Sequence, residues 1–351
     1  MYIDIRDYGY DEFYSKQVND FTLEGIELIP ARVVEIQKDQ YKIISKNGEK
    51  YARLKGVIFY KDSSEVVYPA IGDFVLVSYN DMGDDIIYKV LDRKSKFSRL
   101  DSFNRNLVTK TEQVVATNFQ YLFILTSLNY DFNLGRIERY LAIAWQSGAQ
   151  PIVVLTKTDL CDNYEDKLLE AEKICIGVPV IVASSVTGQG LDEIKSYFKK
   201  GETIAFLGSS GVGKSSLVNA IAGEEIMKVG TIREDDSKGR HTTTHRELIM
   251  MKNGTMIIDT PGMRELEMWD ASEGVESAFS DIEEIAKGCR FRNCKHENEP
   301  DCAVKQALEE GIISKKRWKN YLNLKREVKF AAEKEKQISR LRKKVANKRK
   351  Y

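Results

Sequence analysis

The residues with the most specific chemistry form a glycine-rich loop. Residues 208–215 read Gly-Ser-Ser-Gly-Val-Gly-Lys-Ser, which fits the pattern GxxxxGK[ST] in full. Phosphate oxygens need several donors aimed at one point, and glycines let backbone N–H groups converge there without Cβ clashes. A predicted strand (Thr203–Leu207) enters the loop and a predicted helix (Ser215–Ile221) leaves it, so the helix N-terminus adds positive potential. The loop therefore predicts a site for nucleotide phosphates.

Two side chains of this loop have distinct expected roles. Lys214 is expected to neutralise the β- and γ-phosphates during catalysis, and Ser215 to ligate Mg²⁺. The residues expected to contact the nucleotide here are Gly208, Ser209, Ser210, Gly211, Val212, Gly213, Lys214, Ser215 and Ser216.

A second motif indicates which base is bound. Thr156-Lys157-Thr158-Asp159 follows a predicted strand (Ile152–Leu155) and resembles the guanine-specificity motif [NT]KxD. Guanine presents N1–H and its exocyclic amine together, and a carboxylate at Asp159 can accept both, whereas adenine offers an acceptor there. Such charge-assisted hydrogen bonds are worth roughly 1.5–3 kcal/mol each, which favours guanine. Lys157 is expected to lie along the base and to brace the phosphate loop. The expected base-site residues are Thr156, Lys157, Thr158, Asp159, Ser184 and Ser185, the serines by presenting a backbone N–H to guanine O6.

Two further segments match the mobile metal-binding loops of GTPases. Asp259-Thr260-Pro261-Gly262 fits DxxG, so Asp259 is expected to hold Mg²⁺ through water and the Gly262 amide to face the γ-phosphate. Upstream, residues 239–244 form a polar loop before a predicted strand. Thr243 or Thr244 is expected to complete the metal shell when GTP is bound.

The residue that positions the attacking water is not evident. Many GTPases place a glutamine just after DxxG, but Met263 stands at that position here, and a methionine neither donates nor accepts usefully. Intrinsic hydrolysis should be slow unless another group orients the water. His241, beside the loop threonines, is the candidate, and a solvent-facing loop histidine is an equally good interpretation of it.

The elements that must position these motifs read as alternating strands and helices from about residue 120. Successive βα units predict a parallel sheet with helices on both faces, and Asn253-Gly254 predicts a hairpin between the last two strands. In familiar GTPases the phosphate loop comes first and the guanine motif later. Here the order is rotated, which the same sheet allows if the original termini lie close together.

The segment before this sheet has a different pattern. Residues 29–95 hold about five short alternating strands, which favours an OB-fold barrel, although an SH3-like barrel fits nearly as well. Residues 1–28 carry seven acidic and two basic side chains, an acidic extension that the sequence does not explain.

A cysteine–histidine cluster lies near the C-terminus, with the spacing Cys289-x4-Cys294-x-His296-x5-Cys302. Three thiolates and one imidazole form a closed set typical of structural zinc, with no position left for a catalytic water. The remaining thiols, Cys161 and Cys175, are interpreted as small core residues.

Charge and hydropathy favour a cytoplasmic globular protein with an anionic partner. The net charge is only +1, but residues 311–351 carry 16 basic and 3 acidic side chains. That tail, from about residue 315, is predicted to be helical without a clear core of its own. Neither a signal peptide nor an apolar run of about 18 residues is apparent.

The combination of motifs resembles one family. The order TKTD, SSVTGQG, GSSGVGKSS, GRHTTT, DTPGMREL and CRFRNCKHENEPDCAV is similar to that of the RsgA (YjeQ/YloQ) small ribosomal subunit biogenesis GTPases, over roughly residues 30–345. The resemblance implies a multidomain α/β protein: an acidic extension (1–28), an N-terminal OB-fold that binds RNA (29–98), a circularly permuted P-loop GTPase domain (105–266) and a C-terminal helical zinc-binding module (270–351).

The resemblance also implies an activity and its partners. It implies hydrolysis of GTP to GDP and phosphate, stimulated by the small ribosomal subunit and its rRNA during late maturation of that subunit. It further implies one structural Zn²⁺, Mg²⁺ with GTP, and a monomer in the cytoplasm without a membrane partner.

Three other functions stay open at this stage. One is an RNA-binding GTP sensor with little intrinsic hydrolysis. Another is a GTPase of small-molecule or metal transport, against which the closed cysteine–histidine set argues. The third is an RNA-binding module with a vestigial nucleotide site, against which the complete set of motifs argues.

Overall fold

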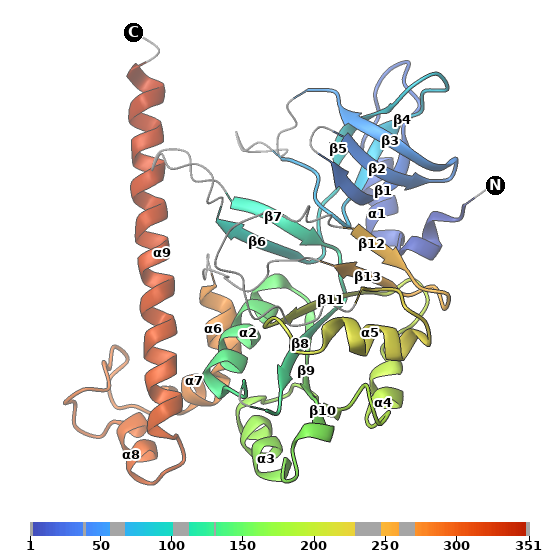
Figure 1. The fold of residues 1–351 in the computed structure, drawn as a ribbon. Coiled ribbons are helices and arrows are strands. Elements are labelled where there is room, and N and C mark those ends of the chain that lie inside the picture. The colour runs from blue at the N-terminus through green and yellow to red at the C-terminus, as the bar shows by residue number, and fades with distance from the viewer. Residues whose placement is uncertain are drawn as a thin grey trace, which may run out of the picture.

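The structure is a computed structural model that describes residues 3–37, 40–56, 67–100, 112–129, 131–228, 247–259 and 271–348. Figure 1 shows a small barrel, drawn in blue, beside a larger α/β unit, drawn in green and yellow. Helices of the C-terminal part, drawn in orange and red, lie against the opposite side of the α/β unit.

The barrel is closed and has five strands. Its strand order is β1-β2-β3-β5-β4, β4 pairs back onto β1, and β3 runs parallel to β5. Alternate residues point inward, so Ala31, Val33, Ile43, Val75 and Ile87 form a buried core. This order is OB-like, and the expected OB-fold is confirmed. The strands are β1 (Ile29–Gln37), β2 (Gln40–Ser45), β3 (Gly48–Leu54), β4 (Phe74–Ser78) and β5 (Asp85–Val90).

The α/β unit has a six-stranded sheet in the order β10-β9-β8-β11-β13-β12. All neighbours are parallel except β12 and β13, which form the hairpin that Asn253-Gly254 predicts. The carboxyl ends of the parallel strands therefore lie at one edge, where the motif loops begin. The strands are β8 (Tyr121–Ser127), β9 (Gln150–Thr156), β10 (Val180–Ala183), β11 (Thr203–Gly208), β12 (Glu247–Met250) and β13 (Met256–Asp259).

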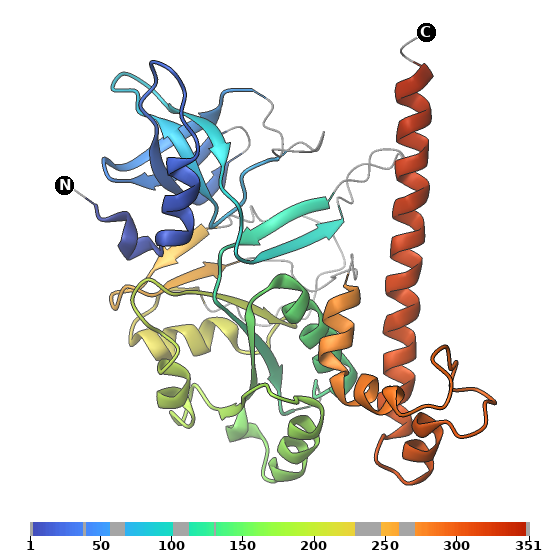
Figure 2. The ribbon, with the colours of Figure 1, turned by 180° about the vertical axis from the view of Figure 1, so that it is seen from behind.

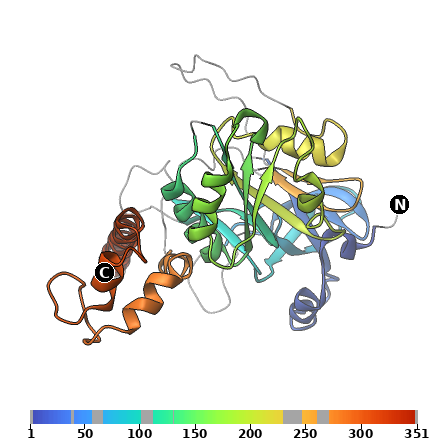
Figure 3. The same ribbon diagram turned by 90° about the horizontal axis from the view of Figure 1, so that it is seen from below.

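Helices cover both faces of this sheet, as Figure 3 shows. Alternation along β8 divides the core: Leu122 and Ile124 pack under one helix pair, and Phe123 and Leu125 under the other. The first pair is α2 (Leu134–Ser147) and α3 (Glu165–Ile174), and the second is α4 (Leu191–Lys195) and α5 (Lys214–Ala222).

The barrel and the α/β sheet are joined at one strand pair. β12 pairs with β1 through Glu35 and Glu247, so the two units form one continuous eleven-stranded sheet. Arg32 of β1 is fully buried at this junction and donates hydrogen bonds to the carbonyls of Tyr8 (2.5 Å) and Asn118 (2.9 Å). Burial lowers the pKa of Arg32 to about 10, which leaves the guanidinium charged at neutral pH.

The acidic N-terminal segment, which the sequence did not explain, packs against the barrel. Tyr14 is 1% exposed and its ring lies 4.2 Å from that of Phe74, centroid to centroid. The segment has two short helices, η1 (Ile5–Tyr8) and α1 (Glu12–Asn19).

The same segment also contacts the α/β unit. Asp7 forms an ion pair with Lys200 at 2.8 Å. Gly9 has φ +81°, and a Cβ added there would lie 2.8 Å from the Gly201 carbonyl oxygen, so the two backbones meet closely. Residues 3–20 therefore act as a clamp between the barrel and the α/β unit.

A second hairpin connects the two units along the chain. β6 (Lys96–Leu100) pairs antiparallel with β7 (Glu112–Thr117) in a separate two-stranded sheet. This hairpin spans the predicted boundary between residues 98 and 105.

The C-terminal module packs on helix α2. An added Cβ at Gly274 would lie 2.0 Å from the Ala142 carbonyl oxygen, so α6 sits directly on α2. In the first half of α9, Tyr321, Leu324 and Val328 are buried in the core cluster that α9 shares with α2, α6 and α7, which fits the expectation that the tail has no clear core of its own. The helices are α6 (Ser272–Ala278), α7 (Ser280–Lys287), α8 (Ala303–Glu309) and α9 (Lys315–Lys348).

The far half of α9 extends away from the neighbouring elements, which is clear in the reverse view of Figure 2. Of the helices in the described ranges, none is both long and apolar enough to cross a bilayer.

Candidate nucleotide-binding site and metal centre

The phosphate loop connects the central strand of the sheet to a helix. β11 ends at Gly208 and α5 begins at Lys214, so the first turn of α5 carries Lys214 and Ser215, both half-buried. Gly211 and Gly213 have φ of +70° and +103°, a left-handed conformation that glycine adopts without strain. These glycines allow the strand to turn directly into the helix.

Side chains of the guanine motif hold this loop. Thr156 Oγ1 donates to the Val212 carbonyl at 2.6 Å, and Lys157 Nζ donates to the Gly211 carbonyl at 2.6 Å. The predicted brace between Lys157 and the phosphate loop is therefore present. Lys157 itself has φ +62°, which turns the chain sharply at the end of β9.

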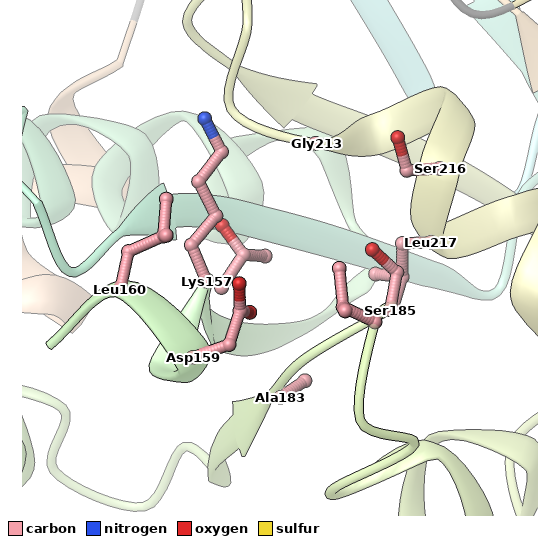
Figure 4. A pocket seen from close by; sticks show the side chains of 10 residues that line it. Lys157, Asp159, Leu160, Ala183, Ser185, Gly213, Ser216 and Leu217 are labelled. Atoms are coloured by element: carbon pink, nitrogen blue, oxygen red, sulfur yellow. The ribbon is translucent and has the colours of Figure 1, made fainter.

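A pocket lies between the guanine motif and the loop after β10. In Figure 4 the Asp159 carboxylate and Ser185 face the same space from opposite sides, with Lys157 extending toward the phosphate loop. The lining residues are Thr156, Lys157, Asp159, Leu160, Ala183, Ser185, Val186, Gly213, Ser216 and Leu217. A polar acceptor set in an otherwise partly apolar cleft suits a planar base.

Ser184 orients the carboxylate of this pocket. Its hydroxyl donates to Asp159 Oδ1 at 2.5 Å and accepts from the backbone N–H groups of Val186 and Thr187, each at 3.1 Å. Because Ser184 is fully buried, these bonds fix the position of Asp159 before any ligand binds.

Two side chains that the sequence-based interpretation did not assign contact the motif loops. Gln189 accepts from Thr158 Oγ1 at 2.8 Å and donates to Tyr164 Oη at 2.9 Å, so the Thr158 side chain is turned toward Gln189. Asp131 accepts a hydrogen bond from Ser209 of the phosphate loop. Gln189 lies within the quoted stretch SSVTGQG, which offered a signal, whereas no local pattern marks Asp131.

Some predicted residues are not placed by the structure. His241, Thr243, Thr244 and Gly262 lie outside the described residues. Asp259 ends β13, beside the phosphate-loop strand, and only its backbone is described.

The predicted metal ligands are brought together in the loop between α7 and α8. The ligand atoms of Cys289, Cys294, His296 and Cys302 all lie within 4.8 Å of one another. His296 Nδ1 is 3.4 Å from Cys302 Sγ and 3.6 Å from Cys289 Sγ, and these two sulfurs are 3.9 Å apart.

These separations fit a tetrahedral ion. Zn–S bonds of about 2.3 Å and Zn–N bonds of about 2.0 Å imply tetrahedral edges of about 3.8 Å between sulfurs and about 3.5 Å between sulfur and nitrogen. Burial raises the pKa of Cys289, but hydrogen bonds from the backbone N–H groups of Val304 and Ala303 outweigh it, and the pKa is lowered overall. The start of α8 thus favours the thiolate form that binds a metal.

The fold and the pocket define a circularly permuted P-loop GTPase. A family model described as RsgA GTPase matches residues 90–269. A second model, described as an ABC transporter, matches residues 191–348, a stretch that contains the phosphate loop but not the guanine motif. The chain belongs to the RsgA GTPase family, and it is therefore an enzyme that hydrolyses GTP.

Relatives and solved structures agree with this membership. Small ribosomal subunit biogenesis GTPase RsgA 2 of Listeria monocytogenes serotype 4b (strain F2365) is 44% identical over 94% of this chain and 91% of its own. Its namesake in Lactiplantibacillus plantarum is 42% identical over 89% of this chain and 86% of its own.

Two crystal structures share the fold. YjeQ from Thermotoga maritima has a TM-score of 0.62 and 27% identity over 85% of this chain and 97% of its own. YloQ, a circularly permuted GTPase, has a TM-score of 0.61 and 26% identity over 88% of this chain and 98% of its own.

Proposed function

We propose that this GTPase binds the small ribosomal subunit and acts in its late maturation, with hydrolysis of GTP stimulated by the subunit. The observation that carries the proposal is that the similarity to relatives named for this role extends along nearly the whole chain. It thus includes the barrel and the C-terminal module as well as the nucleotide site.

Cation–aromatic pairs on the barrel support contact with RNA. Lys50 Nζ lies 4.3 Å from the ring centre of Tyr79, and Lys55 Nζ lies 4.3 Å from that of Tyr88. OB-fold proteins bind nucleic acid through their strands and loops by combining such aromatic rings with positive charge. At the other end of the molecule, Arg290 and Arg292 flank the metal ligands, and α9 is rich in lysine and arginine.

The roles proposed at the phosphate end follow the sequence motifs. Lys214 neutralises the β- and γ-phosphates, and Ser215 and Asp259 hold Mg²⁺, which supplies charge neutralisation when bound. Thr243 or Thr244 completes the metal shell, the Gly262 amide contacts the γ-phosphate, and His241 orients the attacking water. The remaining nucleotide contacts are those of residues 156–159, 184–185 and 208–216.

At the metal centre we propose one structural Zn²⁺ held by Cys289, Cys294, His296 and Cys302. The separations between the ligand atoms within the cluster support this assignment. Since all four positions are protein ligands, the ion orders the loop between α7 and α8 and takes no part in hydrolysis.

The proposal is tested by single-turnover GTP hydrolysis with added small subunits, large subunits or free RNA. We expect acceleration by small subunits only, and none in the Lys214→Ala variant. An equal rate with and without small subunits would contradict the proposal. Binding measured over a series of salt concentrations should weaken steeply, because phosphate contacts release counterions.

A second candidate is an RNA-binding GTP sensor with little intrinsic hydrolysis, and Met263 favours it. The hydrolysis rate with small subunits present separates the two ideas, because a sensor should stay slow there. The comparison of His241→Ala with the unmodified protein then tests which group orients the water. A large loss of the stimulated rate assigns the water to His241, whereas an unchanged rate removes His241 from the mechanism.

We also propose domain limits and a quaternary state. The units are 1–28, 29–98, 105–266 and 270–351, and the protein acts as a monomer in the cytoplasm. Limited proteolysis should cut first near these limits, and light scattering should give the mass of one chain.

A further inference from the structure

The loop that follows β8 is ordered by its own polar side chains. Ser127 Oγ donates to Asn129 Oδ1 at 2.9 Å, and the Asp131 backbone N–H donates to the same oxygen at 3.2 Å. Asn133 then caps helix α2 by accepting from the Arg136 backbone N–H at 3.1 Å. These bonds hold Asp131 at the entrance of α2, at the strand edge where the phosphate loop begins.

Both carboxylate oxygens of Asp131 are engaged. Oδ2 accepts a hydrogen bond from Ser209 Oγ, and Oδ1 accepts one from Arg136 Nη1 at 2.6 Å. Burial raises the pKa of Asp131, but the hydrogen bonds from Ser209 and Arg136 and the charges of Arg136 and Lys157 outweigh it, so the pKa is lowered overall. The group is therefore an anion at neutral pH.

The hydrogen bond between Asp131 and Ser209 is one of three side-chain hydrogen bonds that hold the phosphate loop. Thr156 and Lys157 hold the carbonyls of Val212 and Gly211 in the second half of the loop. Asp131 holds the first half through Ser209, which follows directly after Gly208. A phosphate site gains affinity when its backbone donors are already arranged before the ligand arrives.

We propose that Asp131 is a positioning residue of the GTP site, which acts through the Ser209 hydroxyl to preset the phosphate loop and ties that loop to helix α2. The carboxylate does not contact the phosphates; its effect is transmitted by Ser209. This inference rests on residues 208–215 being the GTP phosphate loop and is independent of the ribosomal partner.

The test is a double-mutant cycle on GDP affinity with Asp131→Ala, Ser209→Ala and the double variant. Loss of a hydrogen bond to a charged group predicts that each single variant binds GDP about tenfold more weakly. The double variant should bind GDP no more weakly than the weaker-binding single variant, because both single substitutions remove the same hydrogen bond. Asp131→Asn, which keeps an acceptor for Ser209, should recover part of the affinity.

A second readout separates positioning from general damage. Guanosine lacks phosphates, so its competition with fluorescent GDP should be unchanged in Asp131→Ala. Equal loss of guanosine and GDP, or additive effects in the double variant, would overturn the proposal. Asp192→Ala, at a fully exposed side chain on α4, is the matched control. If neither Asp131→Ala nor Lys214→Ala weakens the binding of GDP, the assignment of the phosphate loop has failed rather than the role of Asp131.

Discussion

At the scale of single residues, the base pocket depends on a carboxylate held in one orientation. Ser184 takes one lone pair of Asp159 Oδ1, and the buried serine is itself fixed by two backbone N–H groups. The carboxylate can then accept both guanine donors without reorganising. Adenine would place an acceptor against the carboxylate, so the two groups would face each other without a hydrogen bond.

Asp159→Asn should therefore weaken GTP binding. The amide presents a donor to one of the two guanine donors, and we expect a loss of about 2–4 kcal/mol, or roughly 30- to 1000-fold in affinity. Xanthosine triphosphate has a carbonyl in place of the exocyclic amine. Its affinity for the Asp159→Asn variant should fall less than that of GTP, or should rise. Competition against a fluorescent nucleotide measures both. Asp162→Asn serves as the control, and an equal effect of Asp159→Asn on the two nucleotides would contradict the role of Asp159.

At the scale of elements, a buried ionic cluster joins helix α2 to the start of α9. Arg317, 6% exposed, donates to Glu138 at 2.8 Å and to Asp281 of α7 at 2.7 Å. Asn320 donates to the second Glu138 oxygen at 2.6 Å. Burial raises the pKa of Glu138, although Asn320 and Arg317 oppose that shift. The α/β unit and the C-terminal module therefore share one charge network.

Arg317→Met should destabilise the protein by about 3–5 kcal/mol, because Glu138 would remain buried without its cation. The pKa of Glu138 would rise further above its unfolded value, so the native state would bind the extra proton. Stability then increases as the pH falls from neutrality through that folded pKa, so the deficit should shrink as the solution is acidified. Urea unfolding across this range measures the effect, with the exposed neighbour variant Lys316→Met as control. If the free energy of unfolding of Arg317→Met ran parallel to that of the unmodified protein over this pH range, the buried charge of Glu138 would not be the cause of the deficit.

The metal loop is the second element whose order depends on one interaction set. Cys289→Ser should reduce bound zinc from about one ion per chain to nearly none, because a three-ligand remnant binds far more weakly. Trp318 lies edge-on to His296, with ring centres 5.7 Å apart, so its fluorescence should change on chelation. Cys161→Ser, a thiol outside the cluster, should retain the metal. Retention of zinc by Cys289→Ser would remove that residue from the ligand set.

At the scale of the whole molecule, the barrel is held to the α/β unit at several separate places. The β1–β12 pair, the buried Arg32 and the N-terminal clamp all bridge the two units. Along the chain, β12 of this junction follows the segment 239–244, and the C-terminal module follows the DxxG segment, so the order of the motifs links each of these segments to a different neighbouring unit.

Tyr14→Ala should weaken the clamp. Removing a buried aromatic side chain costs about 3–5 kcal/mol of stability, since the cavity beside Phe74 stays unfilled. Phe13→Ala, next to it but 41% exposed, should cost about 1 kcal/mol or less and is the matched control. Thermal unfolding and small-angle scattering would show the loss and any separation of the barrel. Equal effects of the two substitutions would refute the clamp.

The local motifs made much of this protein predictable from its sequence. GxxxxGK[ST], TKTD and the cysteine–histidine spacing each depend on a few neighbouring residues whose geometry is set by the turn that contains them. Alternating apolar residues likewise predicted the barrel strands, and the succession of predicted strands and helices predicted the βα units. The rotated order of motifs followed directly from reading along the chain.

Long-range packing decided the rest. The sequence marks neither Asp131 as a partner of Ser209 nor Glu138 as a partner of Arg317, because residues 78 and 179 positions apart meet only when the sheet and helices are assembled. For the same reason, the role of the acidic extension as a clamp could be recognised only from its contacts with the barrel and the α/β unit, because the extension has no core of its own. Local binding motifs are determined by residue types and their spacing, whereas contacts between distant segments are determined by the packing of the whole chain.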